Sequence, residues 1–150
     1  MVALILWVLG VVALWKVFQK ANIEGWKSLI PFYNDYLLFK IAKRTNLFIT
    51  YIAVYIINIA AASYFAKAAM DVFSGDTFSG AVSIGIGSIV ILVTWAFLII
   101  IRISLSKGIV ENFTVESWYF WGLVFIPKIF LIIMGFSEEV QYKGNNNFES

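Results

Sequence analysis

Residues 81–101 read AVSIGIGSIVILVTWAFLIII, a run of 21 residues without a single charge. A helix of this length rises ~1.5 Å per residue and so reaches across the ~30 Å hydrocarbon layer of a bilayer. The turn-forming residues Ser79 and Gly80 precede the run, and Arg102 ends it. This stretch therefore predicts a transmembrane helix.

Three more apolar runs of similar length occupy residues 2–18, 47–65 and 118–136. Basic residues follow the first run instead of preceding it, so we expect this run to be retained and not cleaved as a signal peptide. The four runs together predict an all-α membrane domain over residues 1–140, a bundle of about four transmembrane helices. Residues 141–150 are polar, and we expect them to form a disordered tail.

The composition agrees with a membrane location and argues against catalysis. The chain is 61% hydrophobic and 13% charged, whereas soluble proteins have roughly 45–50% and 25%. A net charge of +2 provides no basic surface for nucleic acid. Cys and His are absent, and all nine Asp and Glu residues lie outside the four runs. We therefore expect no enzymatic activity, no cofactor and no metal site.

The distribution of basic residues predicts the orientation in the membrane. Residues 16–44 contain six Lys or Arg, whereas the connection after the second run has only Lys67 and the tail only Lys143. Cytoplasmic loops carry the excess of Lys and Arg in membrane proteins. We therefore expect residues 16–44 in the cytoplasm and both termini outside.

The connection between the first two runs, residues 25–44, interleaves aromatic and basic residues. We expect it to form an interfacial amphipathic helix, capped by Ser28 and carrying Pro31 in its first turn. The alternative is a short re-entrant piece packed on the bundle. The candidate residues for binding lipid or a partner are Trp26, Lys27, Pro31, Phe32, Tyr33, Asn34, Tyr36, Phe39 and Lys40.

Two segments resemble a family of small bacterial multi-pass membrane proteins of unknown function. The first reads GWxxLIPFYNxYxLxKIA over residues 25–42, and the second runs from Lys107-Gly108 to Tyr142-Lys143-Gly144. In the resembling family a related domain is also fused ahead of signal peptidase catalytic domains. The resemblance implies a location in the bacterial inner membrane and implies no activity.

Polar residues within the second run fall on one helical face, at Tyr51, Tyr55 and Asn58, with Ala62 one turn further. They either line a polar passage or form hydrogen bonds between helices. The third run carries the small-residue pairs Ala81/Gly85 and Ser83/Gly87, which favour close helix packing. The neighbouring helix belongs to the same chain, to a second copy or to another membrane protein.

Lys128 is the only charge inside a run other than Lys16. In a straight helix it lies close to the bilayer midplane, where a charge costs at least ~2.5 kcal/mol. Either its ammonium group reaches the Leu123 carbonyl freed by Pro127 or snorkels to the surface, or it faces a hydrated cavity or an acidic partner.

The preferred hypothesis is a non-enzymatic membrane subunit that binds or stabilises a partner through residues 26–44. Aromatic residues are enriched in protein contact sites, and this segment concentrates them. The alternative is a small, oligomeric channel or carrier whose passage runs past Asn58 and Lys128.

Overall fold

The computed structural model describes residues 2–144, with side chains from Trp7 onward. Within that range the fold is all-α, as predicted, and contains no strand. The elements are α1 (Val2–Lys20), the 3-10 helix η1 (Gly25–Leu29), α2 (Tyr33–Ile41), α3 (Asn46–Phe73), α4 (Thr77–Asn112), α5 (Tyr119–Phe125) and α6 (Pro127–Phe136).

The chain divides into two compact units. That residues 1–140 form a single membrane domain stays a prediction. The first, called here the packed unit, combines residues 1–45 with residues 103–150. The second, called here the hairpin, consists of residues 46–102.

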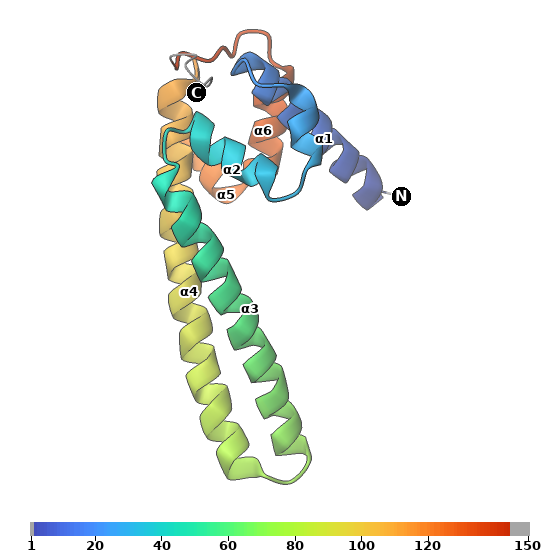
Figure 1. Cartoon of the computed structure of the whole chain (residues 1–150), viewed down its shortest axis with the longest axis vertical. Coiled ribbons are helices and arrows are strands. Elements are labelled where there is room, and N and C mark those ends of the chain that lie inside the picture. Colours follow the sequence, from blue (N-terminus) through green and yellow to red (C-terminus); the bar gives the residue numbers. More distant parts are fainter. Residues whose placement is uncertain (1, 145–150) are drawn as a thin grey trace. The chain divides into compact units, whose positions relative to one another are not determined.

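The hairpin is made of two long helices that run side by side to a tight turn (Figure 1). α3 has 28 residues and α4 has 36, and both are long and apolar enough to cross a membrane. No charge occurs from Leu47 to Ala66 or from Thr77 to Ile101. The turn between the helices contains Gly75, whose φ of 106° is readily adopted by glycine but strained in other residues.

The contact between α3 and α4 repeats every seven residues. On α4 the buried positions are Gly80, Gly87, Thr94 and Ile101. On α3 they are Val54, Ala61 and Ala68. A seven-residue period is typical of helices that pack along a coiled-coil seam, and small residues let the two backbones approach closely.

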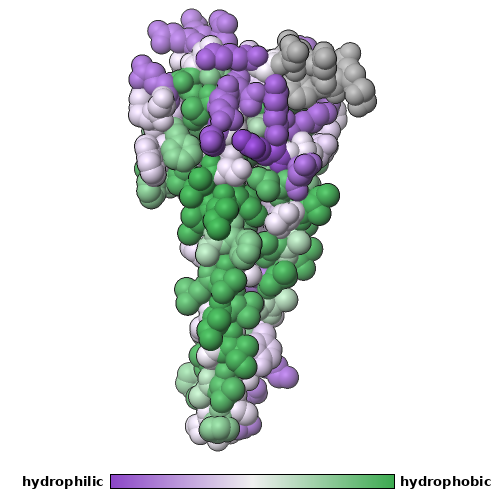
Figure 2. Space-filling model, turned by 90° about the vertical axis from the view of Figure 1, so that its left-hand side faces the viewer, coloured by the Kyte–Doolittle hydropathy of each residue, from purple (hydrophilic) through white to green (hydrophobic). Residues whose placement is uncertain are grey.

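The outward side chains of the hairpin are apolar and uncovered. Only 6% of the residues in the most apolar stretch of α3 are buried, and 17% in that of α4. Green, hydrophobic side chains cover much of the hairpin face in Figure 2. A core helix of a soluble protein would instead be mostly buried.

The packed unit has a closed hydrophobic core built from segments far apart in the sequence. Phe18 from α1, Phe113 after α4 and Met134 from α6 are completely buried. α1 and α6 pack closely at Gly135, which has no side chain. A Cβ atom there would lie only 2.7 Å from the Ala13 carbonyl oxygen. Sequence separation is therefore large throughout this core.

The predicted helix over residues 118–136 is broken in two, so the expectation of one continuous span is wrong. The backbone of Ile126 is not helical, with φ −135° and ψ 61°, between α5 and α6. The cause is Pro127, which has no N–H to donate and disfavours the helical conformation of the residue before it. The chain folds back at this point, since the Phe130 ring lies 5.5 Å from that of Trp118.

The polar tail predicted from residue 141 makes backbone hydrogen bonds at its start, over Gln141–Lys143. The Thr114 amide donates to the Gln141 carbonyl at 2.8 Å, and the Lys143 amide donates to the Asn112 carbonyl at 2.7 Å. These backbone hydrogen bonds hold the segment against the end of α4. The Asn145–Asn147 run of the predicted tail lies outside the described residues.

Candidate functional site

The segment with the aromatic and basic residues forms two short helices instead of one. η1 ends at Leu29 and α2 begins at Tyr33, so Pro31 lies in the turn between them and not in a helical first turn. Ser28 does not cap a helix: it is buried inside η1, and its Oγ has no hydrogen-bond partner among the described residues. The side-chain amide of Asn34 instead donates to the Ser28 carbonyl at 3.3 Å and closes the turn.

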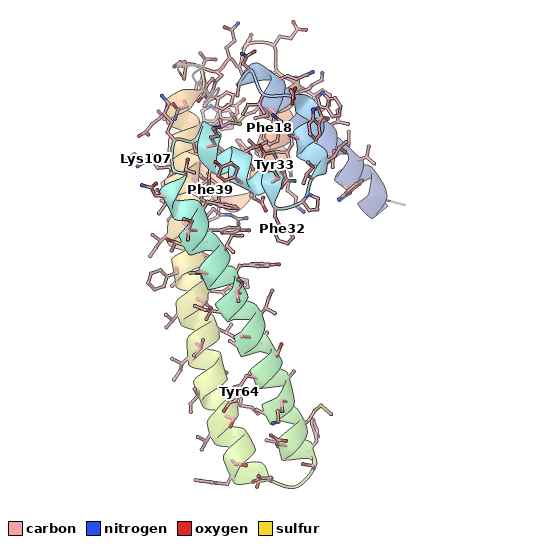
Figure 3. All side chains as sticks on the ribbon, viewed as in Figure 1. Phe18, Phe32, Tyr33, Phe39, Tyr64 and Lys107 are labelled. Carbon is pink, nitrogen blue, oxygen red and sulfur yellow. The ribbon has the colours of Figure 1, made fainter. Side chains whose placement is uncertain are left out.

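This turn presents an apolar surface, called here the 29–33 tip, which comprises Leu29, Ile30, Pro31, Phe32 and Tyr33. All five residues are exposed, and Phe32 is 61% exposed. Figure 3 shows Phe32 directed away from the helices and Phe18 directed into the interior.

Phe32 adopts an uncommon backbone conformation, with φ 64° and ψ −37°. Positive φ is strained for a residue with a Cβ, and a strained residue persists only where its surroundings hold it. Two backbone hydrogen bonds hold the chain here: the Asn34 N–H donates to the Ile30 carbonyl, and the Tyr36 N–H donates to the carbonyl of Phe32 itself. The tip is therefore a fixed shape and not a loose loop.

η1, which leads into the tip, packs on α1 at Gly25. A Cβ atom at Gly25 would lie about 2.1 Å from the Trp15 indole nitrogen, so only glycine leaves room for this ring. Stacking of Tyr33 on Tyr36, with ring centroids 5.8 Å apart, supports the other side. Gly25, the first residue of the first motif, is therefore needed for packing against Trp15.

A small charged group stands at the start of η1. Glu24 pairs with Lys27 at 3.1 Å and accepts a hydrogen bond from the Trp26 indole, also at 3.1 Å. The hydrogen bond that Lys27 donates and the charge of Lys27 lower the pKa of the Glu24 carboxyl. These contacts orient Trp26, which is itself about half exposed.

Most of the nine residues predicted to bind lipid or a partner reach the surface. Trp26, Pro31, Phe32 and Tyr33 are exposed, and Lys27, Asn34, Tyr36 and Lys40 are partly exposed. Phe39 differs from the other eight residues because it is buried, at 2% exposure. Its position on α2 turns it inward, together with Leu38.

Basic residues gather after α2 and near the end of α4. Arg44 and Lys107 both approach Glu111, at 3.6 and 4.0 Å. All three side chains are well exposed, so the pairs contribute little to stability. Among residues 2–144, no three acidic side chains come together as a metal site would require.

The polar residues predicted inside the membrane lie on two elements, Tyr51, Tyr55 and Asn58 on α3 and Lys128 on α6. Asn58 donates to Thr94 Oγ1 at 2.7 Å, a hydrogen bond between the two helices of the hairpin. Tyr51 and Tyr55 stack on each other along α3. Lys128 is exposed at the start of α6 and bonds neither the Leu123 carbonyl nor an acid within the described residues. Asn58 and Lys128 thus lie in different units.

Two structural contacts were missed by the sequence analysis. Lys20 was counted only as an orientation signal, yet its ammonium group donates to the carbonyls of Met134 and Ser137 at the end of α6. Burial lowers the pKa of Lys20, and the charge of Lys16 lowers it further. The other is Tyr142, whose hydroxyl donates to the Ile41 carbonyl at 3.3 Å and so joins the two motif segments.

Comparison with known proteins gives one match. Residues 26–99 match the model of a family described as "Family of unknown function (DUF5684)". The match includes all but the first residue of the GWxxLIPFYN motif and most of the hairpin, and it stops before the second motif segment. No curated protein and no solved structure matches the chain. The matched part of this chain is therefore similar to a family for which no activity is described.

Proposed function

We propose that this protein is a non-enzymatic integral protein of the bacterial cytoplasmic membrane that binds another membrane protein through its 29–33 tip. In this proposal α3 and α4 cross the bilayer, and α1 provides a further crossing. The segment around η1 and α2 lies at the cytoplasmic surface, where its basic residues meet the headgroups.

The fixed, exposed tip is the observation that carries this proposal. Phe32 is held in a strained conformation and still leaves most of its surface uncovered. Strained residues cluster at binding sites, and exposed aromatic residues are frequent anchors of protein interfaces. A segment that needed only to rest in lipid would gain nothing from a fixed shape.

Photo-crosslinking tests this proposal in native membranes. A photoreactive phenylalanine analogue replaces Phe32 in one variant and Ile99, an exposed residue of the hairpin, in the control. We expect position 32 to give a discrete protein adduct that position 99 does not give. The same adduct should disappear when Tyr33→Ser is added, because the tip then loses its neighbouring ring. Adducts with lipid alone at both positions would contradict the proposal.

A channel through this chain has less support. The Asn58 amide is already bonded to Thr94, and no Asp, Glu, His, Lys or Arg lies between Leu47 and Ala66 or between Thr77 and Ile101. Proton and ion carriers usually place such groups within their spans. Reconstituted liposomes should therefore show no flux of ions or small solutes above that of protein-free liposomes.

A further inference from the structure

The sequence predicts a fourth crossing at residues 118–136, but the structure gives these residues another path. α5 has 7 residues and α6 has 10, which at ~1.5 Å per residue correspond to about 10 and 15 Å. Neither helix spans a ~30 Å hydrocarbon layer. The two helices also fold against each other, since the Phe130 ring contacts the rings of both Trp118 and Tyr119.

The segments that precede α5 and follow α6 pair with each other. Thr114 precedes α5 and Gln141 follows α6, and the two are joined by a backbone hydrogen bond of 2.8 Å. Phe113 and Tyr142 continue this pairing with an edge-to-face ring contact at 5.2 Å. A helix that crossed the membrane would leave its two flanking segments about 30 Å apart.

The paired segments also contact the basic loop between α1 and α3. Lys20 donates to the carbonyls of Met134 and Ser137 at the end of α6. Tyr142 reaches back to Ile41, three residues before Arg44. Because basic loops remain in the cytoplasm, the residues bonded to them remain there as well.

The surface of the helix pair is apolar although it is not buried in the packed unit. Its large exposed apolar residues are Trp118, Trp121, Phe125, Ile126, Ile129, Ile133 and Phe136. Phe125, at the bend, is 72% exposed. Lys128 is the only charge between Trp118 and Phe136, and its long stem allows the ammonium group to lean toward headgroups.

We infer that α5 and α6 form a re-entrant pair that enters and leaves the membrane on the cytoplasmic side, with the bend at Phe125–Lys128 in the acyl chains of that leaflet. The inference rests on the proposed membrane location. It places residues 137–144 in the cytoplasm and leaves the N-terminus on the other side. This differs from the expectation that both termini lie outside.

The absence of Cys from the chain makes the path directly measurable. Single cysteines are introduced by Thr45→Cys beside the basic loop, Ser74→Cys at the hairpin turn and Glu139→Cys after α6, all at exposed positions. Spheroplasts are treated with a membrane-impermeant maleimide before and after permeabilisation. We expect labelling of position 74 in intact spheroplasts, and loss of labelling at positions 45 and 139 until the membrane is opened.

Each other pattern has its own meaning. Labelling of position 139 together with position 74 would overturn the re-entrant pair and restore a fourth crossing. Labelling of positions 45 and 139 but not 74 would overturn the cytoplasmic assignment. Equal labelling of all three would mean that the hairpin does not cross, and the proposed function would then fail as well. Each variant should retain the melting temperature of the parent in detergent.

A fourth variant, Phe125→Cys, tests the position of the bend. We expect it to resist the polar maleimide even in permeabilised membranes and to react fully after denaturation in detergent. Reaction in permeabilised membranes without denaturation would place the bend in water and overturn the insertion into the leaflet.

Discussion

The hairpin and the packed unit are both rich in apolar residues but use them in opposite ways. In the hairpin most residues that meet at the seam are small, such as Gly87 and Ala61, and most of the large ones point outward. In the packed unit large residues such as Phe18 and Phe113 are enclosed. The hairpin thus has a surface suited to lipid, whereas the packed unit has the core of a folded domain.

The difference shows where each unit obtains its stability. The hairpin joins neighbours in sequence and, in the proposed membrane location, relies on close backbone approach, because lipid provides no hydrophobic driving force between helices. The packed unit joins distant segments through enclosed rings and side chains that bond to carbonyls, such as Lys20 and Tyr142. Changes at contacts of the packed unit should therefore cost more than changes on the outer face of the hairpin.

The largest effect is expected at Gly108. A Cβ atom there would lie 2.4 Å from the Ala42 carbonyl oxygen, which is backbone and cannot move aside easily. Gly108→Ala should lower the free energy of unfolding by about 1–3 kcal/mol. The matched control is Gly85→Ala in the hairpin, where nothing lies within 4 Å. Thermal unfolding in detergent measures both, and equal effects would show that the contact with Ala42 is not formed.

The next effect is expected at Lys20. Lys20→Met leaves the carbonyls of Met134 and Ser137 without their donor, which costs roughly 1–2 kcal/mol. The control is Lys67→Met, at an exposed position of the hairpin. Chemical denaturation monitored by Trp fluorescence compares them. A Lys20→Met variant as stable as the control would mean that the ammonium group does not bind the end of α6.

A smaller effect is expected for the polar pair of the hairpin. Asn58→Leu, Thr94→Val and the double variant form a cycle that isolates the hydrogen bond between these side chains. We expect a coupling free energy of about 0.6 kcal/mol, the usual size for such bonds between membrane helices. No coupling would argue that Asn58 has another partner, including water in a passage.

The smallest effect is expected at Asp35 and depends on pH. Burial raises the pKa of this carboxyl above 3.8, so the folded protein favours its neutral form. Wild-type stability should therefore fall as pH rises from below 3.8 through the raised pKa, and Asp35→Asn should remove this loss. The variant should be more stable than wild type at pH 7 and equally stable at the acidic end. A constant difference across that pH range would contradict the assignment.

The hairpin could be predicted from sequence because its two helices are local and uncharged. The long runs at residues 47–65 and 81–101 identify α3 and α4 directly, although both helices extend further than the runs. The packed unit could be predicted only in part. A run such as 118–136 looks continuous by hydropathy, and the consequence of Pro127 appears only when the flanking segments are seen to pair.

The candidate site shows the same limit. Trp26 and Phe32 are exposed whereas Phe39 is buried, and composition could not separate them, because aromatic residues serve cores and surfaces alike. The fixed shape of the 29–33 tip depends on Gly25 and Trp15, residues of different helices. No local sequence pattern predicts such a contact.

The central claim is that the outer face of the hairpin lies in lipid, and spin labels on this cysteine-free chain test it most directly. Ile86, Val93 and Ile100 repeat every seven residues on the exposed face of α4, each beside a buried residue of the seam. In liposomes, labels at these positions should collide with dissolved oxygen more often than with a polar nickel complex, most strongly at Val93. A label at Thr45 should show the reverse. Frequent collisions with the nickel complex at Val93 would contradict the account.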